Sequence, residues 1–417
     1  MHRSTDRILT THVGSLIRPE PLRAFLREKE AGRPFDQAAY AKCLRESVAE
    51  VVRQQAEVGI DVVSDGEFGK AISWAQYALF RLGGFERRPF KPVAGNPFTR
   101  GADRTRFAEF YAELDSRDRV ETVLDSVAVG PISYTGQAEL AQDIDDFKAA
   151  LRQVKVVEGF LPVAAPASVI PDRKNEYYKN DDDLQEAIGN AMHTEYKTII
   201  DAGLLVQLDD ARAAVTYDRM VPPKTFKDYR QWLAKQVEII NHAIKGLPRD
   251  KIRYHVCWGS WPGPHSSDVA FKDIADLILK VRAGAYSIEA ANPRHEHEWT
   301  VWRDRKLPAD TVLIPGVISH ATNIVEHPEL VAQRIVRLAH LVGRENVIAS
   351  TDCGFAQVTY FARVHPQIMW AKLAALVEGA RLASKELWRR GAKRPAAKRA
   401  STKRPAAKRP AARRAAG

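Results

Sequence analysis

The sequence has little cysteine and no long uninterrupted hydrophobic run. Only three of its 417 residues are cysteines: Cys43, Cys257 and Cys353. A low, odd cysteine count without a secretory signal argues against a disulfide framework and favours a reducing compartment, so we expect a cytoplasmic protein. No apolar stretch approaches the roughly 18 residues that cross a membrane, so we expect no membrane-spanning segment. The three thiols are therefore expected to serve chemistry or the core.

Acidic residues are missing from one end of the chain. The formal net charge is +11, but residues 391–417 hold ten lysines and arginines and no acid, so the rest is nearly neutral. This segment also lacks large apolar residues and cannot offset its ordering entropy, which predicts a disordered tail. Such Lys/Arg-Pro-Ala repeats resemble histone H1-type tails and would bind nucleic acid or another polyanion non-specifically. The alternative is a solvated tail with no specific partner.

Apolar, β-branched runs alternate with helical patterns through the rest of the chain. Eight runs are typical of strands: 8–16, 60–68, 157–166, 204–211, 252–259, 285–292, 311–319 and 346–354. Helical periodicity lies at 41–59, 186–203, 227–247, 271–284 and 328–343. Eight alternating units predict parallel strands with crossover helices. We therefore predict an α/β fold, a single (β/α)8 TIM-type barrel over residues 1–390, followed by the disordered tail 391–417.

A ninth strand-like run, at 125–134, complicates the strand count. It lies within residues 70–156, which we interpret as a long insertion after an early strand that caps the barrel. A ninth strand in the main sheet is the alternative. The pattern alone does not decide between them, because a short apolar run does not reveal its partner.

Polar or reactive residues follow nearly every predicted strand. They are Ser15, Glu67, Asp209, His255, Cys257, Glu289, His320 and Cys353. In α/β barrels, active sites are assembled at the carboxyl ends of the strands. We therefore expect these side chains to share one pocket.

His255 and Cys257 are separated by one residue on a predicted strand, so their side chains face the same way. Zinc takes cysteine, histidine and carboxylate ligands. Glu289 and Cys353, at the ends of later strands, would supply two more such ligands. The spacing leaves two interpretations open, a metal site or ordinary buried residues.

Several segments together resemble the cobalamin-independent methionine synthase family. The segments HVCWG, SIEAAN and TDCGF are similar to its zinc-site segments, and TTHVGSL, DVVSDGEFGK, VQLDDA and GVISHATN are similar to its other motifs. Full-length members carry two barrels, whereas this chain has length only for the catalytic one. It is similar to a short bacterial branch that also includes epoxyalkane–coenzyme M transferases.

The resemblance implies zinc-dependent methyl transfer from methyltetrahydrofolate or a similar donor to homocysteine, giving methionine. It implies that Zn²⁺ is bound by His255, Cys257, Glu289 and Cys353. A metal-bound thiol is deprotonated, and the thiolate is the nucleophile. Alkyl transfer to another thiol is the alternative, and a chromatin-like binding protein with structural zinc ranks last.

The remaining strand-end groups acquire roles from the same resemblance. Glu67 and Asp209 would hold the substrate ammonium, backbone N–H groups around Ser15 would bind its carboxylate, and His320 would protonate the leaving amine. Judged from the residues alone, a structural salt bridge and a loop hydrogen bond remain open for these groups. Two carboxylates would repel a sulfonate thiol such as coenzyme M, which favours an amino thiol.

Four further features are less specific. Trp74, Trp258 and Trp261 would either stack on a planar donor or pack at the barrel mouth. Asp352 would orient a neighbouring ligand, and residues 294–298 are interpreted as a solvated or substrate-rim loop. The acidic run at 181–183 indicates a helix N-terminus.

Overall fold

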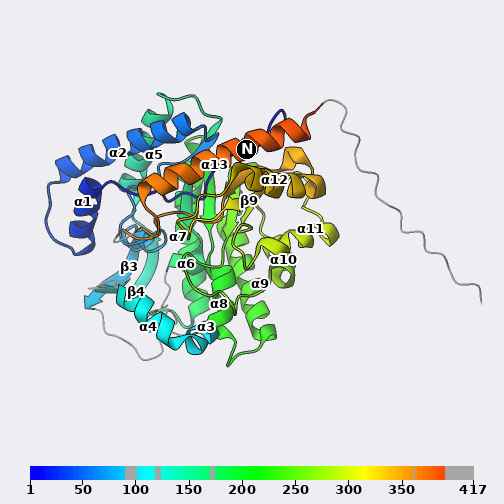
Figure 1. Cartoon of the computed structure of the whole chain (residues 1–417). Coiled ribbons are helices and arrows are strands. Elements are labelled where there is room, and N and C mark those ends of the chain that lie inside the picture. The colour runs from blue at the N-terminus through cyan, green and yellow to red at the C-terminus, as the bar shows by residue number, and fades with distance from the viewer. Residues whose placement is uncertain (90–100, 118–123, 170–173, 360–361, 390–417) are drawn as a thin grey trace, which may run out of the picture.

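The computed structural model describes residues 1–89, 101–117, 124–169, 174–359 and 362–389. Eight parallel strands form a nearly closed barrel with helices outside it (Figure 1). The strands follow the order β1 (Leu9–Thr10), β10 (Ile348–Thr351), β9 (Val312–Ile318), β8 (Ala285–Ile288), β7 (Ile252–Val256), β6 (Leu205–Asp209), β5 (Glu158–Ala164) and β2 (Val62–Val63). A parallel bridge between Thr11 and Val62 joins the two end strands. The predicted barrel is confirmed.

Each of the eight predicted runs contains one barrel strand, but the strands are shorter than the runs. The β-branched first part of a run is fully buried in the sheet, as in Ile252–Val256. The last residues of the run leave the sheet and form the loop that carries most of the polar groups, whereas Asp209 and His255 lie at the ends of β6 and β7 themselves. The strand ends therefore project the candidate site residues from one end of the barrel.

The helices that surround the barrel include all five predicted from periodicity, which correspond to α2, α7, α9, α10 and α12. The α-helices of the described residues are α1 (Glu20–Glu30), α2 (Gln37–Val58), α3 (Ala102–Arg106), α4 (Ala108–Arg117), α5 (Gln137–Leu151), α6 (Pro166–Val169), α7 (Asp181–Asp201), α8 (Arg212–Met220), α9 (Phe226–Ala243), α10 (Phe271–Ile278), α11 (Val301–Asp304), α12 (Pro328–Val342) and α13 (Pro366–Leu387). The described part of the chain contains no helix long and apolar enough to cross a membrane. A cytoplasmic location stays a prediction.

Local signals explain where several helices begin and end. The Asp36 side chain accepts hydrogen bonds from the Ala38 and Ala39 N–H groups at the start of α2, and Gly59 ends this helix with a φ of 100°. The Asn180 side chain accepts from the Asp183 N–H at 2.9 Å, so the acidic run opens α7 as predicted. Such caps satisfy N–H groups that have no partner inside the helix.

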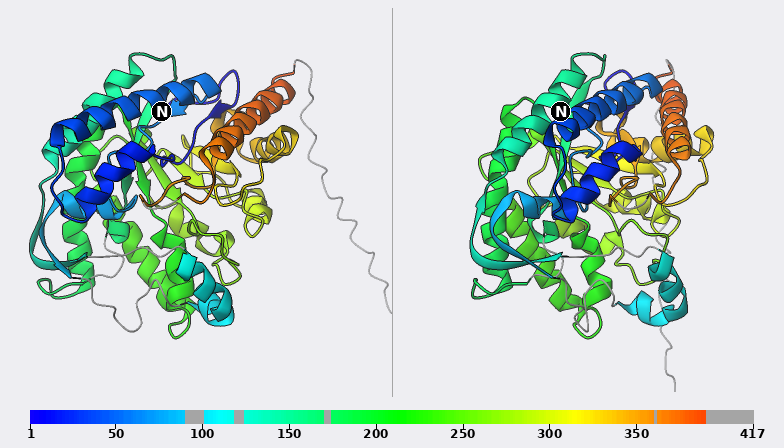
Figure 2. Two further views of the ribbon diagram at one scale, coloured as in Figure 1. Left: turned by 60° about the vertical axis from the view of Figure 1, so that its left-hand side comes forward. Right: turned by 90° about the vertical axis from the view of Figure 1, so that its left-hand side faces the viewer.

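The ninth strand-like run is not part of the barrel. It forms β4 (Leu124–Tyr134), which pairs antiparallel with β3 (Leu82–Pro89) in a separate two-stranded sheet beside the barrel (Figure 2). Arg81, just before β3, donates to Glu195 of α7 at 2.9 Å and also pairs with Asp143 of α5. The insertion is therefore fastened to the barrel helices by a buried ion-pair network. The predicted tail, 391–417, lies outside the described residues.

Candidate metal centre and substrate cavity

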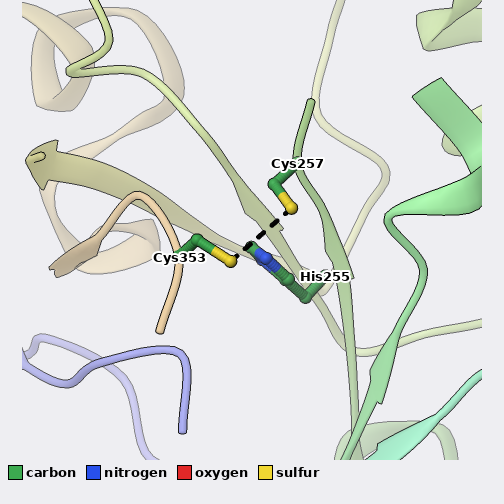
Figure 3. A group of neighbouring side chains, drawn as sticks. All are labelled: His255, Cys257 and Cys353. Carbon is green, nitrogen blue, oxygen red and sulfur yellow. Dashed lines mark hydrogen bonds between the residues drawn. The ribbon is translucent and has the colours of Figure 1, made fainter. Parts of the chain in front are cut away.

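Three soft ligands meet at the carboxyl ends of two strands. His255 lies on β7, Cys257 just beyond it, and Cys353 just beyond β10, with β8 and β9 between these strands. One ligand atom from each lies within 4.8 Å of the other two, and the two sulfur atoms are 3.6 Å apart. Figure 3 shows the three side chains pointing toward one another. The expected juxtaposition of β7 and β10 residues is therefore present.

The donor set of this cluster fits a soft metal ion. The His255 Nδ1 atom is hydrogen-bonded to the Ser287 hydroxyl at 3.1 Å, whereas its Nε2 atom is buried and has no partner in the described chain. Both cysteines are free thiols. A histidine oriented through one nitrogen, beside two thiols, is the arrangement that zinc uses.

Cys353 is the thiol that the surroundings favour as thiolate. The hydrogen bond from Cys257 lowers its pKa well below the usual range, against the effect of burial, and His255 lowers it further. The Ser260 hydroxyl also donates to the Cys353 sulfur at 2.9 Å. Hydrogen bonds to the charged form of a group stabilise that form, so this sulfur is prepared for a cation.

Glu289, the fourth predicted ligand, lies close to the cluster but is not within the group of three. Its Oε2 atom accepts a hydrogen bond from the Trp258 N–H at 2.9 Å, and its Oε1 atom accepts from the Asn292 amide at 2.8 Å. The pKa of Cys257 is raised by its hydrogen bond with Cys353, by burial and by the Glu289 carboxylate, which shows that this charge is near. Metal ligation by Glu289 stays a prediction.

A cavity of about 220 Å³ opens beside the cluster. Its described lining includes six of the eight predicted site residues: Ser15, Glu67, Asp209, His255, Cys257 and Cys353. The expectation that strand-end groups share a pocket holds for these six. His320 and Glu289 are buried but are not among the described lining residues.

The two carboxylates of the cavity, Glu67 and Asp209, are buried and have raised pKa values. Burial raises the pKa of Asp209 to about 7, against the lowering effect of His255, and its Oδ1 atom accepts from the Gln207 amide at 2.8 Å. Burial also raises the pKa of Glu67, against the opposing charge of Lys70. A bound cation would compensate the desolvation of both groups.

Ser15 is held between the first loop and the loop after β10. Its carbonyl accepts from the Phe355 N–H at 2.8 Å, and its hydroxyl accepts from the Ala356 N–H at 3.4 Å. A Cβ on Gly354 would lie 1.9 Å from the Ser15 hydroxyl oxygen, so only glycine permits this approach. The TDCGF segment therefore places Cys353 and fixes Ser15 at the same time.

His320 is buried in the loop after β9, and neither ring nitrogen has a hydrogen-bond partner in the described chain. Burial lowers its pKa, against the effect of the nearby Cys353. Asp352 accepts hydrogen bonds from the Ala290 and Ala291 N–H groups, each at 2.8 Å. It thereby holds the loop that follows Glu289, which agrees with the expected orienting role.

The three tryptophans lie in two different environments. Trp74 and Trp261 line the cavity, whereas Trp258 is fully buried and stacks on His295 with ring centroids 4.1 Å apart. His295 is itself buried and bonds to Asp268 at 2.9 Å and to Glu298 at 3.2 Å. The interpretation of 294–298 as a solvated loop is therefore wrong for His295 and Glu298. Both side chains are buried, because they bond to each other and His295 packs against Trp258.

Several residues that line the cavity or contact its lining escaped the sequence reasoning. Lys70 pairs with Glu67, Ser260 contacts Cys353, and Arg212, Arg219, Gln357 and Arg363 line the cavity. The only local signal was position, since Lys70 follows Glu67 by three residues and Ser260 follows Cys257 by three. Arg212 and Arg219 are seven residues apart on α8, which places them on one helix face.

Comparisons with known proteins indicate one family. A family model described as the catalytic domain of the cobalamin-independent synthase matches residues 8–86 and 131–376. The uncharacterized YxjH of Bacillus subtilis is 26% identical over 386 residues, covering 91% of this chain and 94% of that protein. A methionine synthase of Saccharolobus solfataricus is 24% identical over 385 residues, covering 92% of this chain and 96% of that protein.

A solved structure supports the fold independently. The B12-independent methionine synthase of Shewanella sp. W3-18-1, in complex with selenomethionine, superposes with a TM-score of 0.66 at 20% identity, covering 91% of this chain and 99% of that chain. The family model matches most of the chain, and the resemblance seen in the sequence motifs is confirmed. The chain belongs to the cobalamin-independent methionine synthase family and is a thiol S-methyltransferase of that family.

Proposed function

We propose that the protein transfers a methyl group to the thiol of homocysteine and gives methionine, with Zn²⁺ held by His255, Cys257 and Cys353 and completed by Glu289. The observation that carries this proposal is that a cluster of three soft ligands and two carboxylates line one cavity. This chain covers 96% and 94% of the length of two relatives named methionine synthases, which further supports the proposal. When bound, zinc would hold the acceptor sulfur as a thiolate.

The protein's own groups orient the acceptor in this proposal. Glu67 and Asp209 bind the ammonium, and backbone N–H groups around Ser15 bind the carboxylate. Since these residues line the same cavity as Cys257 and Cys353, an acceptor held there presents its sulfur to the cluster. The thiolate sulfur forms a bond to the methyl carbon as the bond from this carbon to the donor breaks.

We propose methyltetrahydrofolate or a similar compound as the donor and His320 as the proton donor to its leaving nitrogen. A histidine is suited to this task near neutral pH. The two ring nitrogens of His320 have no partner within the described chain, which supports a role in bonding an incoming group. Trp74 and Trp261, at the cavity wall, offer surfaces for a planar donor.

A second candidate function is alkyl transfer to an acidic thiol such as coenzyme M. Arg212, Arg219 and Arg363 line the cavity, and this feature favours an anionic substrate. The two carboxylates of the same cavity oppose a sulfonate at the acceptor position. We therefore rank this function second.

The test incubates the purified protein, loaded with Zn²⁺, with homocysteine and either methyltetrahydrofolate or methylcobalamin. We expect methionine, detected by mass spectrometry, and a rate on the order of 10³-fold lower with the Cys353→Ser variant. Parallel reactions contain coenzyme M and an epoxyalkane. Product only in the parallel reactions would replace the first function by the second, and product in neither would contradict both.

A further inference from the structure

Glu67 is held in a backbone conformation that is uncommon for a residue with a side chain. Its φ is 61°, and its N–H donates to the Asp65 side chain at 2.9 Å. The Arg18 guanidinium donates to its carbonyl from the other side. Non-glycine residues in this region carry a strain on the order of 1–3 kcal/mol and persist where the surroundings hold them. The turn therefore fixes the Glu67 carboxylate against the cavity.

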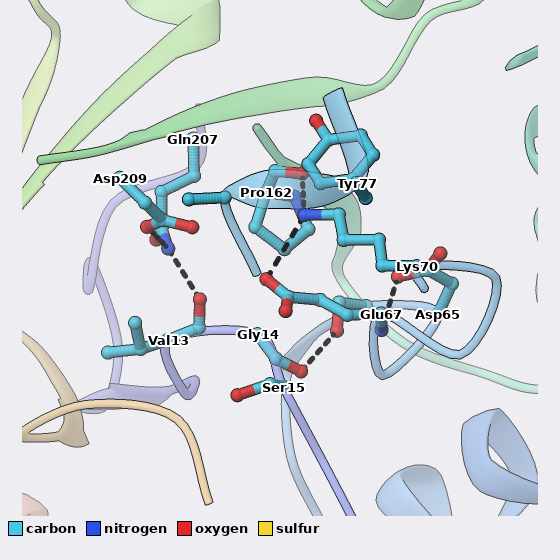
Figure 4. A network of polar contacts seen from close by, with 12 residues as sticks. Val13, Gly14, Ser15, Asp65, Glu67, Lys70, Tyr77, Pro162, Gln207 and Asp209 are labelled. Carbon is cyan, nitrogen blue, oxygen red and sulfur yellow. Dashed lines mark hydrogen bonds and ion pairs between the residues drawn. The ribbon is translucent and has the colours of Figure 1, made fainter. Parts of the chain in front are cut away.

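Lys70 holds this carboxylate from the side away from solvent. The Lys70 side chain is 7% exposed, and its Nζ atom lies 3.2 Å from Glu67 Oε1 and 2.7 Å from the Pro162 carbonyl. The same ammonium lies 4.4 Å from the centroid of the Tyr77 ring (Figure 4). These three contacts compensate the desolvation of the lysine and define its position.

Only one oxygen of Glu67 is used by this ion pair. The Oε2 atom is buried and has no hydrogen-bond partner among the described residues, although Glu67 lines the cavity. In Figure 4 the bonded oxygen faces Lys70 and the other faces away from it. A buried carboxylate oxygen without a donor is costly, so the position demands a donor from a ligand.

We propose that Lys70 is a positioning residue that sets the preference of the cavity for an acceptor with an amino group. By binding Glu67 Oε1, it favours the charged form of the carboxylate against the effect of burial and leaves Oε2 for the substrate ammonium. The inference rests on the proposed function, because it takes the acceptor to be an amino thiol. It predicts that loss of Lys70 weakens recognition of the amine and leaves recognition of the rest of the ligand unchanged.

The test measures product binding, which needs no methyl donor. Isothermal titration calorimetry compares L-methionine with 4-(methylthio)butanoate, which lacks the amino group, on the full-length protein. We expect the wild type to prefer methionine and Lys70→Met to reduce this preference about tenfold, the loss of one charged hydrogen bond. Lys70→Arg, which keeps the charge, should restore most of the preference.

Controls separate a positioning role from a structural one. If Lys70→Met binds 4-(methylthio)butanoate as the wild type does, the cavity is intact, and Lys70→Gln is measured in the same way should Lys70→Met not fold. An undiminished preference in these variants, or an equal loss for both ligands, would overturn the inference alone. A wild type that binds neither ligand, or does not prefer methionine, would overturn the proposed acceptor together with the inference.

Discussion

The two ends of the cavity are built on different principles. At the end that we call the sulfur end, one ligand atom each of His255, Cys257 and Cys353 lies within 4.8 Å of the other two, and the buried Nε2 atom of His255 has no partner in the described chain. At the carboxylate end, Glu67 and Asp209 are each already held by one protein group, Lys70 and Gln207. The first end is incomplete without a cation, whereas the second is preorganised and needs only a substrate amine.

The comparison predicts that the largest loss of activity follows substitution of a residue at the sulfur end. Cys353→Ser should abolish retention of one equivalent of zinc and lower turnover on the order of 10³-fold, because the activated thiolate is lost. Metal content by mass spectrometry and methionine formation check both effects. Cys43→Ser is the matched control, since Cys43 is half-buried on α2 and lies outside the cluster. Full zinc content and activity in Cys353→Ser would show that the ligand assignment is wrong.

The next largest predicted effect is on stability and depends on pH. It concerns His12, which bonds to Gly14 in the loop beside the carboxylate end. Burial lowers the pKa of His12 from 6.5 to about 4, and its Nδ1 atom accepts from the Gly14 N–H while Nε2 bonds to Gln55. The folded-state pKa of His12 lies below the unfolded value, so the buried neutral imidazole adds to the free energy of unfolding. This contribution is complete above about pH 6.5 and is lost as the pH falls toward about 4. We expect the free energy of unfolding to fall by about 3 kcal/mol over this pH range.

Denaturant unfolding at pH 7 and at pH 4.5 checks this expectation. His12→Asn should remove most of the difference between the two pH values, whereas His242→Asn, at an exposed position of α9, should not. An identical pH dependence in wild type and His12→Asn would contradict the assignment to His12.

Two adjacent acids should separate binding from stability. Asp209→Asn should raise the KM for homocysteine about 10–100-fold, since a charged hydrogen bond to the ammonium is lost. Asp210→Asn should instead lower the melting temperature, because Asp210 accepts from the Tyr254 hydroxyl at 2.8 Å and from the Ala213 N–H at 3.1 Å. Steady-state kinetics and thermal unfolding are measured on both variants. Equal KM values for them would remove Asp209 from the acceptor site.

The smallest predicted effect returns to the sulfur end. Ser260→Ala removes a hydroxyl that donates to Cys353, so the thiolate loses about 1 kcal/mol of stabilisation. We expect zinc affinity to fall about fivefold, as measured by competition with a chelator. Ser266→Ala, which removes a hydroxyl bonded to Asp103 on α3, is the control. Unchanged affinity in Ser260→Ala would show that this hydrogen bond does not act on the metal.

The sequence predicted the barrel well because its signals are local. β-branched runs alternate with helical patterns, and each of the eight runs contains a barrel strand. The insertion was harder, because β3 is rich in glycine and arginine and has no apolar alternation. Its residues become a strand only by pairing with β4, which no local pattern reveals.

The site residues were predicted from strand ends and motifs, but their partners were not. The positions of Ser15, Glu67, Asp209, Cys257 and Cys353 at one cavity agree with the expectation. The bonding of Glu289 to Trp258 and Asn292 was not foreseen, because it depends on how two loops meet. The burial of His295 and Glu298 was missed for the same reason.

The sequence by itself determined which residues follow each strand, and hence the chemical types available at one end of the barrel. Only the tertiary structure decided which of them touch, because Cys257 and Cys353 are separated along the chain by 96 residues and by two intervening strands, and meet only when the sheet curls into a barrel. The pairing of Lys70 with one oxygen of Glu67 likewise depends on Pro162 and Tyr77 closing over the ammonium. Local pattern sets what a loop carries, and packing sets what it faces.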